Sequence, residues 1–170
     1  MNAIVTYRNL LLLLFLAAGN CSDVLAQKDT TKKQKTTITW LTFQQLEDSM
    51  RVNPKPIFID IYAVWCGPCK LMDKRTFTNK YVIREMSQSF YAIKLDGETK
   101  DTLRFNGKEY SFKIVRDGKG ANALALEVGM ESNTLSYPTI VILDKNYKLV
   151  YRYPSFLTAE MLEEVLIQFR

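Results

Sequence analysis

One stretch of the 170-residue chain decides its fold: Ile57-Phe58-Ile59-Asp60-Ile61-Tyr62-Ala63-Val64-Trp65-Cys66-Gly67-Pro68-Cys69-Lys70. Its first half is short, continuously apolar and rich in branched residues, which is typical of a strand buried on both faces of a parallel sheet. After Cys66 the apolar residues follow a helical pattern, beginning with Leu71 and Met72. The stretch therefore predicts a buried strand that runs directly into a helix, with Cys66 at the junction.

The residues on both sides of this stretch predict a βαβ unit. Thr42 and Gln45 have the spacing of a capping box, which predicts a helix over about 42–51. A second buried strand is expected over 90–95, after the helical region that follows Cys66. This strand–helix–strand order favours parallel strands joined by a right-handed crossover.

The last part of the chain predicts two hairpins and two helices. Asn106-Gly107 separates two runs with strand character, which is a strong signal for a hairpin. We further expect a helix over 121–128, an antiparallel edge hairpin with strands over 140–143 and 148–153, and a final helix capped by Thr158. The apolar face of that final helix comprises Met161, Leu162, Val165, Leu166 and Phe169.

Cys66 and Cys69 carry the strongest chemical signal. A cysteine at the start of a helix lies near unpaired amide groups and the positive end of the helix dipole, so its thiolate form is favoured. Pro68 suits the first turn of a helix, where no amide hydrogen is needed. Cys69 lies one turn along, and two thiols at this spacing can exchange a disulfide with a partner without any cofactor.

The composition argues against several other chemistries. The chain has 3 cysteines and no histidine, which removes Ser-His-Asp and Cys-His nucleophilic sites and every histidine-based metal site. A zinc site needs four ligands, so we expect no metal at the Cys66–Cys69 pair. A purely structural disulfide is the other alternative, but closing so short a loop would contribute little stability.

Residues 1–26 have the pattern of a secretory signal peptide. Arg8 precedes an apolar run over 10–18 that is too short to span a bilayer and suits the central region of such a peptide. Cleavage is expected after Ala26. Processing as a lipoprotein through Cys21 is a second route, and a retained membrane anchor is the remaining alternative. Either processing route exports the protein.

Residues 27–37 form a polar, basic segment ahead of the expected domain over 38–170. This segment holds +3 of the chain's net charge of +5, so little basic charge is left for a folded face. We interpret residues 27–37 as a disordered linker and expect no nucleic-acid partner.

The stretch over 57–70 resembles the active-site strand and helix start of the thioredoxin family, and Tyr137-Pro138-Thr139 resembles the cis-proline loop of that family. The likeness covers nearly all of residues 38–170. It implies an α/β thioredoxin fold, with a central mixed β-sheet flanked by helices. Ahead of the cis-proline loop the chain is longer than a minimal thioredoxin, so we expect an inserted hairpin region at about 97–120.

The resemblance also implies roles for the residues of the motif. Cys66 would be the attacking thiolate and Cys69 the buried resolving thiol. Asp60 matches the buried carboxylate of the family, and burial would raise its pKa, so it is a candidate acceptor for the proton of Cys69. Lys94, in the neighbouring strand, would either pair with that carboxylate or extend its ammonium group to solvent.

The remaining residues implied by the resemblance would bind substrate. Trp65 would flank an exposed Cys66 sulfur, and Gly67 and Pro68 would shape the surface beside it. The backbone of Tyr137, ahead of a cis Pro138, would pair with an extended substrate segment. The alternative for Tyr137 is simple core packing.

Taken together, these expectations describe an exported, periplasmic thioredoxin-like oxidoreductase that reduces protein disulfides in the cell envelope. Its partners would be disulfide-bearing client proteins and a membrane electron donor, and its redox group would be the Cys66–Cys69 disulfide alone, with no further cofactor. A disulfide oxidase or isomerase, and a non-enzymatic binding module, are the alternatives. The sequence does not indicate the oligomeric state.

Overall fold

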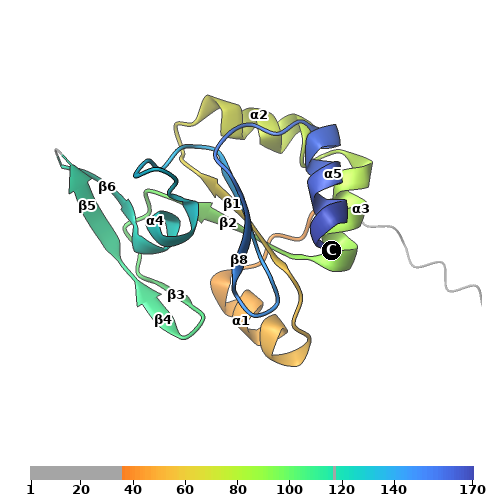
Figure 1. Ribbon diagram of the computed structural model, residues 1–170, viewed down its shortest axis with the longest axis horizontal. Coiled ribbons are helices and arrows are strands. Elements are labelled where there is room, and N and C mark those ends of the chain that lie inside the picture. Colours follow the sequence, from red (N-terminus) through yellow and green to blue (C-terminus); the bar gives the residue numbers. More distant parts are fainter. Residues whose placement is uncertain (1–35, 117) are drawn as a thin grey trace, which may run out of the picture. The chain divides into compact units, whose positions relative to one another are not determined.

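A four-stranded mixed sheet with the strand order β2-β1-β7-β8 forms the centre of the fold in the computed structural model, which describes residues 36–116 and 118–170 (Figure 1). Its strands are β1 (Ile57–Tyr62), β2 (Tyr91–Asp96), β7 (Thr139–Leu143) and β8 (Leu149–Tyr153). β1 runs parallel to β2 and antiparallel to β7, so the predicted βαβ unit and the predicted mixed sheet are confirmed.

The predicted signal peptide, residues 1–26, and most of the linker predicted over 27–37 lie outside the described residues. The two processing routes, cleavage after Ala26 and lipidation at Cys21, therefore stay predictions. Among the helices of residues 36–116 and 118–170, none combines the length and the hydrophobicity that a transmembrane helix requires.

Helices cover both faces of the sheet (Figure 1). They are α1 (Phe43–Val52), α2 (Gly67–Arg75), α3 (Lys80–Ser89), α4 (Ala123–Gly129) and α5 (Ala159–Phe169). Phe58 belongs to the core formed with α2, α3 and α5, whereas Ile59 belongs to the core formed with α1 and α4. Because successive side chains of a strand point to opposite faces, Asp60 lies on the same face as Phe58, towards α2.

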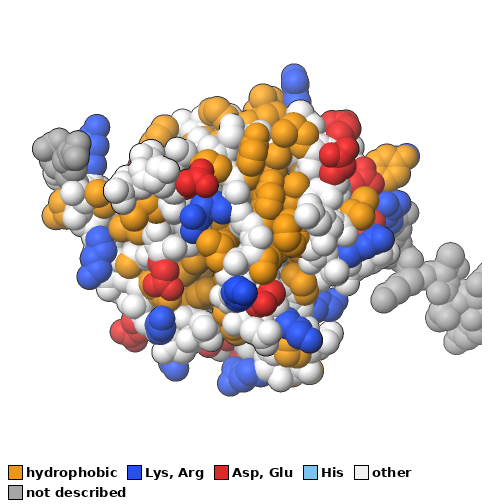
Figure 2. Space-filling view, viewed as in Figure 1, with side chains coloured by type: hydrophobic (Ala, Val, Ile, Leu, Met, Phe, Trp, Pro, Cys, Tyr) orange, Lys and Arg blue, Asp and Glu red, His pale blue; other side chains and the backbone are white. Residues whose placement is uncertain are grey.

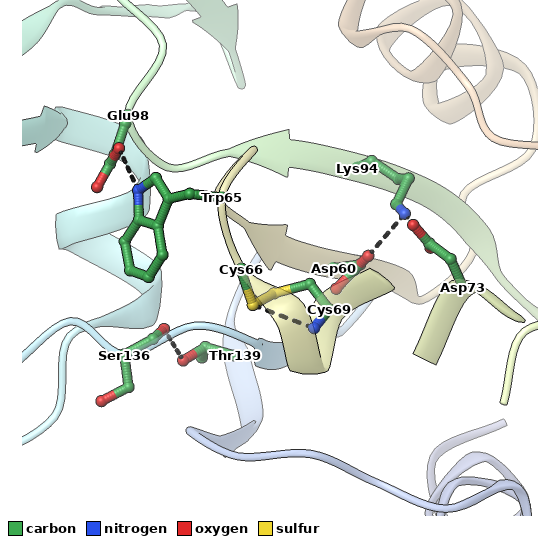
Figure 3. Close-up of a disulfide and its surroundings, with 9 residues drawn as sticks. All are labelled: Asp60, Trp65, Cys66, Cys69, Asp73, Lys94, Glu98, Ser136 and Thr139. Carbon is green, nitrogen blue, oxygen red and sulfur yellow. Dashed lines mark hydrogen bonds and ion pairs between the residues drawn. A yellow bond between two sulfur atoms is a disulfide. The ribbon is translucent and has the colours of Figure 1, made fainter. Parts of the chain in front are cut away.

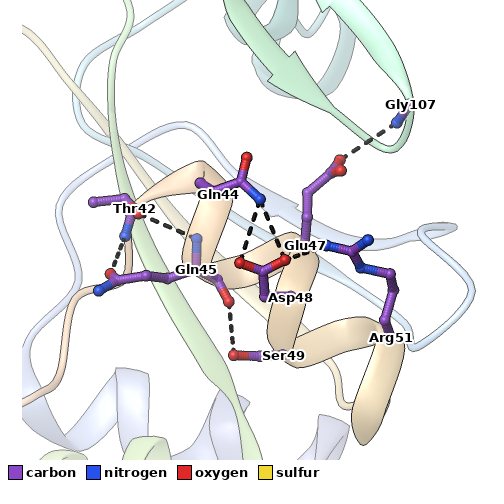
Figure 4. A network of polar contacts seen from close by, with 8 residues as sticks. All are labelled: Thr42, Gln44, Gln45, Glu47, Asp48, Ser49, Arg51 and Gly107. Atoms are coloured by element: carbon purple, nitrogen blue, oxygen red, sulfur yellow. Dashed lines mark hydrogen bonds and ion pairs between the residues drawn. The ribbon is translucent and has the colours of Figure 1, made fainter.

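Local signals in the sequence set the ends of these helices. The Thr42 side chain accepts a hydrogen bond from the Gln45 amide, and the Gln45 side chain accepts one from the Thr42 amide, so the predicted capping box is confirmed (Figure 4). Thr158 caps α5, as predicted. In α5, Leu162 is fully buried but Met161 is exposed, so placing Met161 on the apolar face was wrong. Helical periodicity turns Leu162 towards the sheet and leaves its neighbour at the boundary with solvent.

Two hairpins are inserted between β2 and the helix α4. Their strands are β3 (Leu103–Phe105) with β4 (Lys108–Tyr110), and β5 (Phe112–Arg116) with β6 (Lys119–Asn122). The turn of the first hairpin is Asn106-Gly107, whose φ angles are 50° and 72°. Positive φ at both positions is what a two-residue hairpin turn requires, and the predicted hairpin is confirmed.

The second hairpin corrects the helix that the sequence predicts over 121–128. Ala121 pairs with Lys113 across the β5–β6 hairpin, and Asn122 is the N-cap of the helix, so α4 begins only at Ala123. A Cβ atom on Gly120 would lie 2.0 Å from the carbonyl oxygen of Lys113, which shows that the close approach of these strands needs glycine. The inserted region therefore reaches Asn122 and contains one more hairpin than expected.

β7 and β8 form the predicted antiparallel hairpin at the edge of the sheet. Figure 2 shows a band of hydrophobic side chains down the middle of the viewed face, where Figure 1 places β8. Leu149 and Val150 of this strand are exposed, while all five residues of β7 are buried. The contrast follows from position, because an edge strand has a sheet neighbour on one side only.

Candidate active site

Cys66 is the N-cap residue of α2, directly after the loop that leaves β1. Its amide donates to the carbonyl oxygen of Ala63 over 3.0 Å, which holds the turn, and its sulfur accepts a hydrogen bond of 3.1 Å from the amide of Cys69. Pro68 lies in the first turn of the helix. An amide hydrogen and the positive end of a helix dipole both point at this sulfur, and both favour a thiolate there once the disulfide is reduced.

The two cysteines form a disulfide in this structure, with a Cα–Cα distance of 5.3 Å. Cys66 is only 1% exposed, so the expectation that Trp65 flanks an exposed Cys66 sulfur is wrong for this oxidised state. Tyr62 and Tyr137 pack against the small cluster that contains the disulfide. These two rings therefore cover part of the disulfide.

Asp60 is a buried carboxylate on β1, and Figure 3 shows its side chain between the start of α2 and Lys94. Burial raises its pKa to about 6, although the ammonium group of Lys94 acts in the opposite direction. One oxygen, Oδ2, lies 3.2 Å from Lys94 Nζ. The other oxygen, Oδ1, has no hydrogen-bond partner in the described part of the chain. Asp60 can thus hold or release a proton near neutral pH.

Lys94 contacts a second carboxylate, that of Asp73 on α2 (Figure 3). Its ammonium group also lies 5.2 to 5.6 Å from the ring centres of Trp40, Tyr62 and Phe77. Burial would lower the pKa of Lys94, but the two carboxylates outweigh that effect and raise it, so Lys94 stays charged. Asp73 was not identified from the sequence. Its spacing of four residues from Cys69 on a predicted helix was the available signal.

Trp65 and Tyr137 form an aromatic pair beside the disulfide. Their ring centres are 5.8 Å apart and the planes meet at 80°, which is an edge-to-face contact. The indole of Trp65 donates to Glu98 Oε2 over 2.9 Å, although Trp65 as a residue is 67% exposed (Figure 3). Tyr137 precedes the cis peptide bond to Pro138, as the resemblance implies. Glu98 was not identified from the sequence, because nothing local to it indicates a contact 33 residues away.

A groove of about 680 Å³ extends from this aromatic pair along the inserted region. Its lining includes Trp65, Glu98, Val115, Lys119, Leu126 and Met130. Val115, on β5, is 61% exposed although it is aliphatic. Gly67, which the sequence analysis assigns to substrate binding, is exposed at the start of α2 and is not among the residues that line this groove.

Comparison with known proteins identifies the family. Residues 43–170 match a family model described as a thioredoxin-like domain. The chain belongs to this family. Over 54 residues it is 43% identical to the thiol:disulfide interchange protein DsbD of Campylobacter jejuni, a match that covers 32% of this chain and 9% of that protein. Over 88 residues it is 48% identical to the chloroplastic thioredoxin Y2 of Arabidopsis thaliana, covering 46% of this chain and 47% of that one. The chain therefore spans less than half the length of either relative.

Solved structures support the same fold for this thioredoxin-like domain. The DsbH oxidoreductase has a TM-score of 0.53 at 14% identity, with 81% of this chain and 89% of that chain covered. A structure described as a putative disulphide-isomerase from Bacteroides thetaiotaomicron has a TM-score of 0.51 at 23% identity, covering 78% and 93%. At such identities the likeness shows the fold alone, and the predicted thioredoxin fold is confirmed.

Proposed function

We propose that this thioredoxin-like domain is a thiol–disulfide oxidoreductase that reduces the disulfides of client proteins in the cell envelope. The observation that carries the proposal is the placement of Cys66 at the N-cap of α2, with its sulfur accepting the Cys69 amide. Such an environment stabilises a thiolate, and a thiolate is the form that attacks a disulfide. The match to DsbD, whose name describes thiol:disulfide interchange, supports the same chemistry.

In the proposed reaction, the reduced protein passes two electrons to a client. The Cys66 thiolate attacks one sulfur of the client disulfide, a mixed disulfide forms, and the first client sulfur leaves as a thiolate. The Cys69 thiol then gives its proton to Asp60 and attacks the Cys66 sulfur. The Cys66–Cys69 disulfide forms, and the second client sulfur leaves and takes up the proton held by Asp60. The first client thiolate takes up a proton from water, so both client cysteines end as thiols.

The groove beside the aromatic pair would receive the client polypeptide. An extended segment with apolar side chains fits a wall that offers Val115 and Leu126, and Lys119 at the same wall would pair with an acidic side chain. Trp65 and Tyr137 would then position the client cysteine over the disulfide. This arrangement makes the inserted region a source of client preference.

Each catalytic cycle consumes two electrons, so a donor must reduce the Cys66–Cys69 disulfide again. We propose that the protein is exported and that a membrane electron carrier reduces it. This proposal rests on the signal peptide predicted over residues 1–26 and on the match to DsbD. Exported thiol–disulfide enzymes are not supplied by cytosolic reductants, so a membrane route is the consistent source of electrons.

Two measurements test this function. First, the reduced Cys69→Ser variant should form a stable mixed disulfide with proteins of an envelope extract, because the resolving thiol is absent. The Cys66→Ser/Cys69→Ser double variant is the control. Capture by neither variant would favour a non-enzymatic binding module.

Second, the equilibrium reduction potential of the Cys66–Cys69 couple should lie near that of thioredoxin, about −270 mV. A value near about −120 mV, which is typical of a strong periplasmic oxidant, would contradict reduction and favour an oxidase. A value between these two would favour an isomerase.

A further inference from the structure

Lys94 is shared between two carboxylates that differ in their access to water. The Asp60 side chain is 2% exposed, whereas the Asp73 side chain is 46% exposed. The ammonium group lies 3.2 Å from Asp60 Oδ2 and makes its closer contact with Asp73. Figure 3 shows Lys94 reaching Asp60 and Asp73 from the other side of the site than the disulfide.

The arrangement has one positive and two negative charges when Asp60 is ionised. Without Asp73, Asp60 and Lys94 would form a buried ion pair with no net charge. The ammonium group would then favour the ionised carboxylate and oppose its protonation. With Asp73 present, the ammonium is partly neutralised already, and the second negative charge works against ionisation of Asp60. Asp73 therefore opposes the formation of a locked ion pair in the interior.

We propose that Asp73 is a positioning residue: it draws the Lys94 ammonium group towards the surface and so leaves the buried carboxylate of Asp60 free to take and return the proton of Cys69. The inference rests on the proposed function for its biological meaning, because the proton matters only when Cys69 resolves a mixed disulfide. The Cys69 thiol gives its proton to the unpaired Oδ1 atom, the thiolate attacks the Cys66 sulfur, and the proton later leaves with the departing client sulfur or to water.

The other groups around Asp60 do not substitute for Asp73. On β1 the nearest titratable group is the phenol of Tyr62, whose pKa burial raises, so it stays neutral at physiological pH. From β2 the charged groups are Lys94 and Asp96, and Asp96 acts on Tyr62. α2 also carries Lys70, Lys74 and Arg75, but none of them is among the groups that shift the pKa of Asp60. Cys69 and the N-cap residue Cys66 are joined in the disulfide. From β7 the residue paired with Asp60 is Ile140, which carries no charge.

The test is the Asp73→Asn variant, which keeps the size of the side chain and removes its charge. In the oxidised protein, the carboxyl carbon of Asp60 should titrate at a lower pH than in the wild type, as followed by carbon NMR. A shift of half a pH unit corresponds to about a threefold change in the ratio of carboxylate to acid. The half-exposed position of Asp73 makes unfolding of this variant an unexpected outcome, and Asp73→Glu should restore the wild-type titration.

A kinetic readout follows the same proton. Ellman's reagent reacts first with Cys66, and the second thiolate product is released only when Cys69 attacks the mixed disulfide. In Asp73→Asn the pH at which this second phase is half maximal should fall with the pKa of Asp60. Above that pH the second phase should be slower by up to about threefold, because a carboxylate paired more firmly with Lys94 is a weaker base for the Cys69 proton. Asp48→Asn is the matched control, because Asp48 is another partly exposed carboxylate paired with a cation, Arg51 on α1, and it should change neither readout (Figure 4).

An Asp60 titration that is identical in wild type and Asp73→Asn would overturn the proposal. Because the NMR titration uses the oxidised protein without any client, its outcome does not depend on the proposed function. If the Asp60 titration shifts in Asp73→Asn but Cys69→Ser captures no client, the proposed reductase function is contradicted and the role of Asp73 is not. If Cys69→Ser captures clients but the Asp60 titration does not shift, the role of Asp73 is contradicted and the proposed function is not.

Discussion

The ring of Tyr137 lies directly against Gly97, and a Cβ atom on Gly97 would come within 2.5 Å of Tyr137 Cε1. Gly97 cannot move away easily, since its amide donates to the carbonyl oxygen of Tyr62 and its carbonyl oxygen accepts from the amide of Asn122, each over 2.8 Å. The position of Tyr137, and of the Trp65 ring that packs on it, therefore depends on the absence of a side chain at residue 97.

Replacing Gly97 with alanine should displace the ring of Tyr137, which lies beside the disulfide. We expect Gly97→Ala to lower the free energy of unfolding by about 1–3 kcal/mol, because the added methyl group overpacks a buried site. The reduction of a disulfide-bonded client protein should slow as Tyr137 is displaced. Chemical denaturation and a client-reduction assay measure the two effects.

Gly67→Ala is the control for stability, because a Cβ atom there meets no atom within 4 Å. It should change the free energy of unfolding by less than about 1 kcal/mol. Equal stability of wild type and Gly97→Ala would mean that the Tyr137 ring shifts freely, contrary to the contacts that surround Gly97.

The features that the sequence predicts correctly are those with local signals. The continuous apolar run of β1, the capping box at Thr42 and the Asn106-Gly107 turn each act within a few residues, so they are readable without the tertiary structure. The β5–β6 hairpin has no such signal. Its strands are mostly exposed, and its need for Gly120 becomes visible only when the carbonyl of Lys113 lies across from it.

The same division applies to the site. Cys66, Cys69 and Asp60 follow one another in a single motif, whereas Asp73 and Glu98 take part through contacts made by folding. The burial of Cys66 was also beyond the sequence, because it results from rings such as that of Tyr137, far along the chain. Residues that act through a distant partner need the fold before they can be recognised.

The pKa of Asp60 gives a pH dependence of stability with a definite sign. The folded protein holds the proton more tightly than the unfolded chain, since the pKa is raised from 3.8 to about 6. Asp60 therefore contributes stability below about pH 4, and this contribution is lost as the pH rises through about 6. A shift of about two pH units corresponds to roughly 3 kcal/mol.

Asp60→Asn removes this titration. The stability of the variant relative to the wild type should rise by roughly 3 kcal/mol between about pH 4 and about pH 7, as measured by urea denaturation of both oxidised proteins. The trend with pH, not the absolute difference at one pH, carries the prediction. A relative stability that stays flat over this range would mean that Asp60 keeps an ordinary pKa.

Because β5 supplies Val115 to the wall of the groove, we expect this strand to contribute to the binding of protein clients. Val115→Asp places a charge in the apolar wall and should slow the reduction of an unfolded, disulfide-bonded protein by about tenfold, which corresponds to about 1.4 kcal/mol of lost binding. Reduction of a small disulfide that cannot reach the groove should be unchanged. Ile114→Asp is the matched control, because Ile114 is the preceding residue on β5, is 74% exposed and does not line the groove. Equal effects of the two variants on the protein client would remove the groove from client binding.

The buried carboxylate of Glu85 ties the last residue of the chain to α3. Arg170 Nη1 lies 2.9 Å from its Oε2 atom and Arg84 holds its other oxygen. Burial alone would raise the pKa of Glu85, but hydrogen bonds from these two arginines lower it. These contacts therefore stabilise the fold above about pH 4.5 and less as the pH falls.

Arg170→Ala should lower the free energy of unfolding by about 1–3 kcal/mol at neutral pH, and this loss of stability should become smaller in acid. Arg51→Ala, which breaks an exposed pair with Asp48, should cost less than about 1 kcal/mol in the same urea titration, and equal costs would contradict a special role for Glu85.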